Sequence, residues 1–187
     1  MARRRPATRD DQTGLMNLDA FGYVVDHVVR RANRSGECVT VVCIGLEAPG
    51  SAGPDPAALY RVARVLRSEL RGEDVVARVG EAEFAVALPD TDASAGEVVV
   101  AWIEAKLAEH DAQAPGGPSP VVIGRATLEP EGGLVKVEEL LDAARASTRG
   151  PSSLHGVLPA ARPIRTLPGR PAGRRQAHLR ALHPDRP

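Results

Sequence analysis

The clearest indication of the fold comes from residues 70–89, which have the sequence L-R-G-E-D-V-V-A-R-V-G-E-A-E-F-A-V-A-L-P. Two runs rich in valine and alanine, Val75–Val79 and Glu83–Leu88, lie on either side of the short segment Gly80–Ala82. Apolar, β-branched runs that flank a glycine-containing turn predict a β-hairpin. The sequence therefore predicts two adjacent antiparallel strands near the middle of the chain.

Helical and strand patterns alternate on both sides of this hairpin. Apolar residues at spacings of three and four indicate helices, and continuous β-branched runs indicate buried strands. The expected order is helix, strand, helix, hairpin, helix, strand, helix, which favours an α/β (α+β) fold. Its antiparallel sheet would carry helices on one face, or nearly so. The predicted helices are Asn17–Asn33, Asp55–Leu70, a helix that Asp92 opens and that buries Val98 and Trp102, and one around Val137–Ala144; the outer strands are Val39–Leu46 and Val121–Leu128.

Charge divides the 187-residue chain into three parts. Residues 1–9 carry +4 and residues 158–187 carry +6, so the acidic body carries −10 although the formal net charge is zero. We expect a flexible basic leader over 1–9, one domain over 10–157 and a disordered Arg/Pro-rich tail over 158–187. An acidic body excludes a globally basic nucleic-acid-binding domain. A solvated tail is favoured over one that contacts nucleic acid, an acidic partner or a membrane surface.

Composition excludes further classes of protein. Aromatic residues make up 3% of the chain, which argues against a stacking platform for single-stranded nucleic acid. The longest apolar run, Val39–Leu46, is too short to span a membrane, and the first residues lack the apolar core of a signal peptide. Cys38 and Cys43 are expected on opposite faces of a strand, where they do not bridge. These features predict a cytoplasmic protein with reduced cysteines.

Three segments in this order resemble the GGDEF domain family, the bacterial diguanylate cyclases. Asp11–Asn17, with Phe21 four residues on, resembles the family's opening D-x-L-T-G-L-x-N-R-x-x-F, and Leu70–Val79 resembles the segment that leads into the signature. Gly80-Glu81-Ala82-Glu83-Phe84 then stands at the G-G-D/E-E-F signature in a degenerate form. The resemblance covers about Asp10–Arg149. It implies a ferredoxin-like palm related to nucleotidyl cyclases, and a dimer that joins two GTP molecules into cyclic di-GMP.

The resemblance also implies where metal ions bind, and this chain departs from the family there. Gly45 stands at the family's aspartate at the end of the first strand, and Ala82 replaces the acidic third residue of the signature. Neither side chain ligates magnesium. Glu47, on the same face as Gly45, is the alternative carboxylate, and Glu83 is retained. We expect the family's magnesium site to be lost and no cofactor to bind.

Three other functional positions depart from the family as well. The second signature glycine is Glu81, whose carboxylate would repel phosphates or simply lie in solvent on a hairpin turn. The guanine-recognition stretch, here Ala48–Pro56, is shortened and lacks its asparagine, and Asp55 is interpreted as a helix cap. The phosphate-binding lysine has no counterpart in Ala144–Arg149, where Arg149 is the nearest cation. These losses together predict a chain without catalytic residues, and not an enzyme.

Arg71-Gly72-Glu73-Asp74 matches the family's inhibitory R-x-x-D motif at its usual offset before the signature. Arginine binds phosphate or a guanine edge, and aspartate accepts from guanine N–H groups. A solvated charge pair at a helix end is the alternative. The resulting hypothesis is an inactive GGDEF-type signalling module that binds cyclic di-GMP through Arg71 and Asp74. The alternatives are a protein-interaction scaffold and, remotely, an active cyclase; an unknown protein partner and a homodimer are further expectations.

Overall fold

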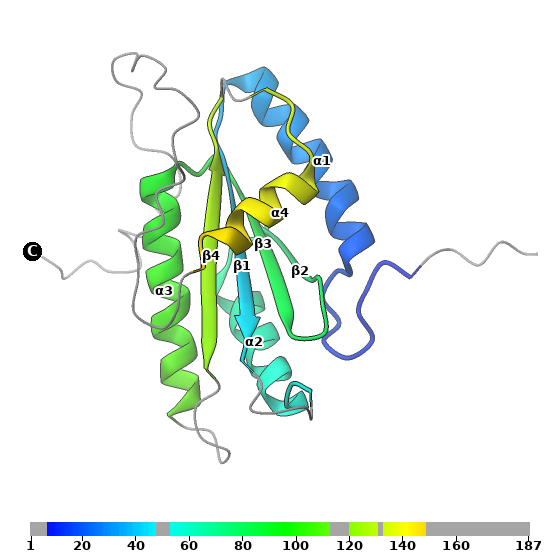
Figure 1. Cartoon of the computed structure of the whole chain (residues 1–187), viewed down its shortest axis with the longest axis vertical. Helices are drawn as coiled ribbons and strands as arrows, with labels where there is room; N and C mark the ends of the chain where they lie inside the picture. Colours follow the sequence, from blue (N-terminus) through cyan, green and yellow to red (C-terminus); the bar gives the residue numbers. More distant parts are fainter. Residues whose placement is uncertain (1–6, 48–52, 113–119, 131–132, 149–187) are drawn as a thin grey trace, which may run out of the picture.

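Helices and strands follow the order that the sequence predicts. The computed structural model describes residues 7–47, 53–112, 120–130 and 133–148. Figure 1 shows how these elements are arranged. They are α1 (Leu18–Ser35), β1 (Val39–Leu46), α2 (Pro56–Glu69), β2 (Val75–Arg78), β3 (Glu83–Pro89), α3 (Ala93–Asp111), β4 (Val121–Leu128) and α4 (Val137–Ala146). The predicted hairpin is therefore confirmed as β2 and β3.

The strands form one antiparallel sheet in the order β2-β3-β1-β4. β1 is central, so that Val42 pairs with Val86 of β3 on one side and with Arg125 of β4 on the other. Seven of the eight β1 residues are buried, because each face of the strand lies under side chains. A strand of continuous apolar residues therefore requires a helix layer on both faces of the sheet.

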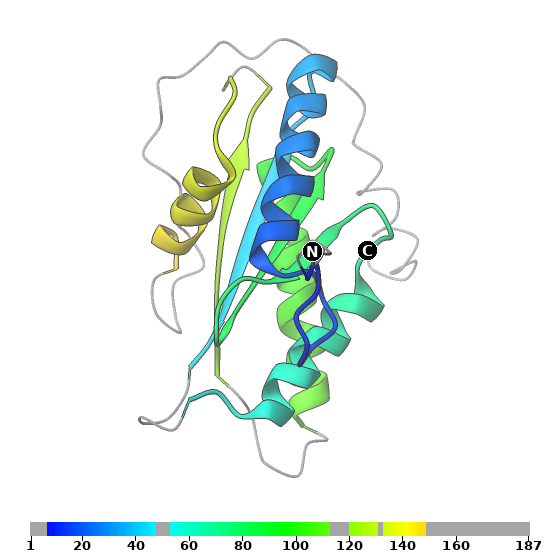
Figure 2. The ribbon, with the colours of Figure 1, turned by 90° about the vertical axis from the view of Figure 1, so that its right-hand side faces the viewer.

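Helices cover both faces of the sheet, which corrects the expectation of helices on one face. Residues of α1 and α4 form a core with one face, and residues of α2 and α3 form a second core with the other. Figure 2 shows the yellow helix α4 on one side of the strands and the cyan helix α2 toward the opposite side. The physical reason is the lack of polar alternation in β1 and β3, which leaves two apolar faces to bury.

Side-chain caps start three of the helices. The carboxamide of Asn17 accepts from the N–H of Ala20 at 3.0 Å, and the carboxylate of Asp92 accepts from Ala95 at 2.7 Å. Asp55 accepts from the N–H of Ala57 at 3.0 Å, directly before Pro56. Such caps satisfy backbone donors that the first helical turn leaves open. The interpretation of Asp55 as a helix cap is thus confirmed.

One side chain of α3 faces solvent, although the sequence pattern predicts that it is buried. Val98 was expected inward but is 48% exposed, because the buried stripe of α3 runs through its neighbours Val99 and Val100 instead. Trp102 is half-buried, with the Lys106 ammonium 4.9 Å from its ring centre. The helix is apolar around much of its circumference, so periodicity alone does not fix its rotation.

Both cysteines are free thiols, as expected. Cys43 is buried beneath α4, and burial raises its pKa to about 12. Cys38 directly precedes β1, and burial together with its hydrogen bond to Glu129 raises its pKa to about 12. Neither thiol forms the reactive thiolate at neutral pH.

Parts of the predicted organisation fall outside the described residues. The leader is described only from residue 7, and the Arg/Pro-rich tail over 158–187 is not described at all. Both segments stay predictions. Among the helices that the structure describes, none has the length and apolarity needed to cross a membrane.

A glycine on β4 sets the distance between the sheet and α4. A Cβ built on Gly124 would lie 2.2 Å from the carbonyl oxygen of Ala144 and 2.6 Å from the Cγ2 of Thr148. The first of these atoms belongs to the helix backbone and does not move independently of α4. Only glycine therefore permits this approach.

We expect Gly124→Ala to lower the free energy of unfolding by about 3 kcal/mol or more, since α4 must shift away from the sheet. Gly22→Ala is the matched control, because a Cβ there meets nothing within 4 Å and the residue lies inside α1. The free energy of unfolding of this control should rise by about 0.5–1 kcal/mol, because alanine has a higher helix propensity than glycine. Urea unfolding followed by circular dichroism measures both, and equal effects would contradict this packing.

Candidate functional site

Residues 80–82 form the turn that joins β2 to β3. The N–H groups of Val79 and Gly80 both donate to the carbonyl of Glu83, at 2.9 and 3.2 Å. The carbonyl of the last turn residue accepts from the N–H of Leu46 at 2.8 Å, which fixes the turn to the end of β1. The N–H of Gly80 is therefore used inside the hairpin and is not presented to a ligand.

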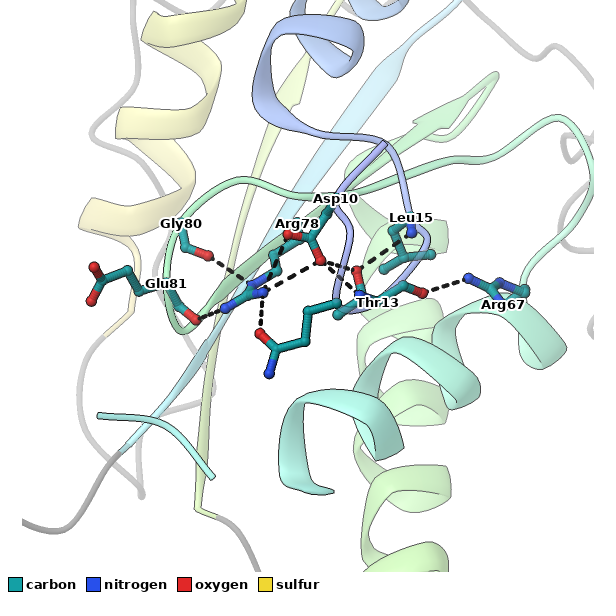
Figure 3. Close-up of polar contacts among 8 residues, drawn as sticks. Asp10, Thr13, Leu15, Arg67, Arg78, Gly80 and Glu81 are labelled. Atoms are coloured by element: carbon teal, nitrogen blue, oxygen red, sulfur yellow. Dashed lines mark hydrogen bonds and ion pairs between the residues drawn. The ribbon is translucent and has the colours of Figure 1, made fainter. Parts of the chain in front are cut away.

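The guanidinium of Arg78 holds this turn from the end of β2. Its Nε donates to the carbonyl of Gly80 at 3.1 Å and its Nη2 to the carbonyl of Glu81 at 2.5 Å. Its Nη1 donates to Gln12 at 2.6 Å and lies 3.3 Å from the carboxylate of Asp10. Figure 3 shows Arg78 between the turn and the N-terminal loop, with the Glu81 carboxylate pointing away from both. One side chain thus joins two segments far apart in sequence.

Asp10 organises the N-terminal loop that Arg78 contacts. Its Oδ1 accepts from the backbone N–H of Thr13 at 2.8 Å and from the Thr13 hydroxyl at 2.6 Å. The carbonyl of Thr13 in turn accepts from Arg67 of α2 at 2.8 Å. Burial tends to raise the pKa of Asp10, but the hydrogen bonds from Thr13 and the charge of Arg78 outweigh it and hold the pKa below its usual value.

The aspartate that closes the N-terminal loop is Asp10, one residue before the segment Asp11–Asn17 that resembles the family's opening motif. Asp11 is exposed, whereas Asp10 makes the contacts that close the loop. The signal that identifies Asp10 is its spacing from Thr13, because an aspartate three residues before a backbone N–H closes a local turn. Arg78 lies within Leu70–Val79, and the sequence alone gives it no role.

Glu83, the acid retained from the signature, forms an ion pair with Arg145 of α4. Arg145 donates through Nε to Oε1 at 2.7 Å and through Nη2 to Oε2 at 2.9 Å, so both carboxylate oxygens are engaged. The same guanidinium reaches Asp142 at 2.9 Å. The bond to Glu83 raises the pKa of Arg145 above its usual value. Arg149, the cation singled out from the sequence, lies outside the described residues.

Arg71 and Asp74 lie together in the tight turn between α2 and β2. The carboxylate of Asp74 accepts from the backbone N–H of Arg71 at 2.9 Å, and the N–H of Asp74 donates back to the Arg71 carbonyl at 3.1 Å. Asp74 is buried, at 9% exposure, and the Arg71 side chain lies 3.3 Å from the exposed Glu73. Asp74 therefore has a structural role in closing the turn, whatever else it binds.

Residues 53–149, just over half of the chain, match the family described as "Diguanylate cyclase, GGDEF domain". This chain belongs to the GGDEF domain family. The expected palm-like fold is thereby confirmed, with its antiparallel sheet and flanking helices.

Solved GGDEF domains share this fold. The GGDEF domain of DgcB from Caulobacter crescentus, in complex with c-di-GMP, has a TM-score of 0.65 and 22% identity over 78% of this chain and 88% of that chain. A sensory box/GGDEF family protein from the same organism gives 0.61 and 27%, over 76% and 96%. Diguanylate cyclase SiaD from Pseudomonas aeruginosa, in complex with its activator SiaC, gives 0.64 and 21%, over 75% and 56%. No curated protein matches the sequence.

The metal positions of the GGDEF domain fall where the hairpin meets β1. Gly45 pairs directly with Glu83 across β1 and β3, and Ala82 packs against the core on the α2 and α3 side. Glu47 is exposed beyond the end of β1. Within the described residues, no three histidine, cysteine or acidic side chains come together as a metal site. Glycine and alanine supply no side-chain ligand, and both carboxylate oxygens of Glu83 accept from Arg145.

We expect Asp10→Asn to lower the free energy of unfolding at pH 7 by about 1 kcal/mol, because the hydrogen bonds from Thr13 and Arg78 lose their charged acceptor. The depressed pKa means that this contribution is complete above the unfolded-state value, about 3.9, and is lost as the pH falls through the folded-state value. The difference from the natural chain should therefore shrink below about pH 4.

Urea unfolding at a series of pH values measures this difference. Asp11→Asn is the matched control, since Asp11 is exposed and should change stability little at any pH. An equal effect of both substitutions would assign the stabilisation to net charge instead of to the Asp10 contacts.

Proposed function

We propose that this chain is a GGDEF module without diguanylate cyclase activity. The observation that carries the proposal is the bidentate pairing of Glu83 with Arg145, next to Gly45 and Ala82 at the positions that the family uses for metal ligands. Joining two nucleoside triphosphates requires cations that neutralise charge on the transferred phosphoryl group. A carboxylate whose two oxygens both accept from one guanidinium is poorly placed to bind a cation as well.

The turn supports the same proposal through its backbone. A phosphate-binding turn presents free N–H groups to the anion. Here the N–H of Gly80 donates to the backbone carbonyl of Glu83. The carbonyls of Gly80 and Glu81 accept from the guanidinium of Arg78. The exposed carboxylate of Glu81 adds a negative charge where a polyanion would approach.

The first test is an assay of the full chain with GTP and either Mg²⁺ or Mn²⁺, with products separated by liquid chromatography. We expect no cyclic di-GMP above the level of buffer alone. Titration with Mn²⁺, followed by electron paramagnetic resonance, should show no site in the natural chain. The variant Gly45→Asp/Ala82→Asp/Arg145→Ala should bind Mn²⁺, because it restores two carboxylates and releases Glu83.

Glu83→Gln is the control for this assay. Product formation by the natural chain that disappears in Glu83→Gln would overturn the proposal and assign Glu83 to catalysis. Product that persists in Glu83→Gln would identify a contaminating activity in the preparation.

We further propose that the module binds cyclic di-GMP through the turn at residues 71–74. The observation that favours this ligand is the closure of the turn by Asp74, which holds the Arg71 backbone at the surface end of α2. The Arg71 side chain is 14% exposed and lies 3.3 Å from the 55% exposed carboxylate of Glu73, so it must turn outward from this contact to reach a phosphate. The relative DgcB, in complex with c-di-GMP, supports the choice of ligand.

Calorimetric titration of cyclic di-GMP tests this binding. We expect micromolar affinity and a loss of at least tenfold in Arg71→Ala, because a forked contact with phosphate is removed. Arg34→Ala, at the exposed end of α1, is the matched control and should bind normally.

Absence of heat at millimolar ligand would exclude the site at residues 71–74. The module would then act as an interaction scaffold without nucleotide binding. The complex of the relative SiaD with its activator SiaC supports protein binding as the alternative role.

A further inference from the structure

An open groove with a volume of about 300 Å³ lies along α2, beside the N-terminal loop. Its lining consists of five side chains from two turns of α2 and one from the loop. They are Tyr60, Ala63, Arg64, Arg67, Ser68 and Thr13. None of these residues belongs to the signature turn or to the turn at residues 71–74, so the groove is separate from the proposed function.

Two arginines give the groove a positive charge without a local counter-ion. Among the described residues, neither Arg64 nor Arg67 forms an ion pair, and the lining contains no carboxylate. Arg61, on the same helix, shows the contrast because it pairs with Asp111 of α3 at 3.3 Å. Arg67 uses Nη2 to donate to the Thr13 carbonyl at 2.8 Å, which orients the guanidinium and leaves other N–H donors.

An exposed aromatic ring lies one helical turn from Arg64 and about two turns from Arg67. Tyr60 is 62% exposed. It is one of only five aromatic residues in the 187-residue chain. Side chains at positions i and i+4 of a helix are neighbours, so the ring of Tyr60 lies next to Arg64. A ring of this kind offers a face for stacking, and a nearby guanidinium offers a fork for phosphate.

We propose that this groove binds a small aromatic molecule that carries a phosphate, of the size of a nucleoside monophosphate. The ring of the ligand stacks on Tyr60, and the phosphate accepts from Arg64 and Arg67. The volume lies at the lower end of the range for small-ligand sites, about 300–1,000 Å³. The lining covers about 12 Å of one helix. That extent suits a small ligand better than a protein interface, which buries about 800 Å² per partner.

The experiment is a titration of adenosine monophosphate and guanosine monophosphate into the full chain, followed by heteronuclear NMR. We expect submillimolar binding of at least one, weakened at least tenfold in Tyr60→Leu and in Arg64→Gln. Tyr23→Leu is the matched control, because Tyr23 is the other exposed tyrosine and lies on α1 beside His27. Arg71→Ala should also leave this binding unchanged, which separates it from the cyclic di-GMP site.

Several results would overturn the proposal. Absence of binding by both nucleotides would exclude the ligand class. Equal binding of inorganic phosphate, unaffected by Tyr60→Leu, would reduce the groove to a site for simple anions. Competition by hexaglutamate at equal concentration would assign the groove to an acidic protein segment. A shift of affinity in Tyr23→Leu as large as in Tyr60→Leu would place the ligand elsewhere.

Discussion

The guanidinium of Arg78 is the contact on which the arrangement of the signature turn depends. It donates to two backbone carbonyls of the turn and, from its other edge, to the side chains of Asp10 and Gln12. A planar fork of donors suits this task, because it binds several acceptors without reorganising. The N-terminal loop, the end of β2 and the turn therefore form one unit.

Much of the fold is predictable from local sequence. The strands Val39–Leu46 and Val121–Leu128 occur with the bounds expected from their apolar runs, and Asp55 and Asp92 start helices as caps should. These features depend on residues close in sequence, which is why pattern reasoning finds them. The arrangement of the helices on the two faces of the sheet is harder to predict from the sequence. The continuous apolar runs of β1 and β3 leave two apolar faces to cover, but which helix covers which face depends on how four helices share these surfaces.

The candidate site likewise contains features that the sequence reveals and features that only the structure reveals. That Gly45 and Ala82 carry no carboxylate is visible in the sequence. Their place at the family's metal ligands is what the resemblance to the family implies. The partner of Glu83 is not visible in the sequence, since Arg145 comes from a helix 62 positions away. Nor does the R-x-x-D pattern reveal that Asp74 is buried and bonded to the backbone of Arg71. Tertiary contacts decide how a retained motif residue is used, and a motif describes only its spacing.

The pairing of Glu83 with Arg145 has an evolutionary consequence under the proposed function. A lineage that regains one carboxylate, at Gly45 or at Ala82, still has Glu83 engaged by the guanidinium, so the single step brings little benefit to metal binding. Loss of Arg145 alone leaves Glu83 unpaired beside positions without ligands. Under the proposed function, no single substitution therefore restores a set of free carboxylates at this corner of the sheet. Recovery of a metal site would therefore require substitutions at Gly45, Ala82 and Arg145 together.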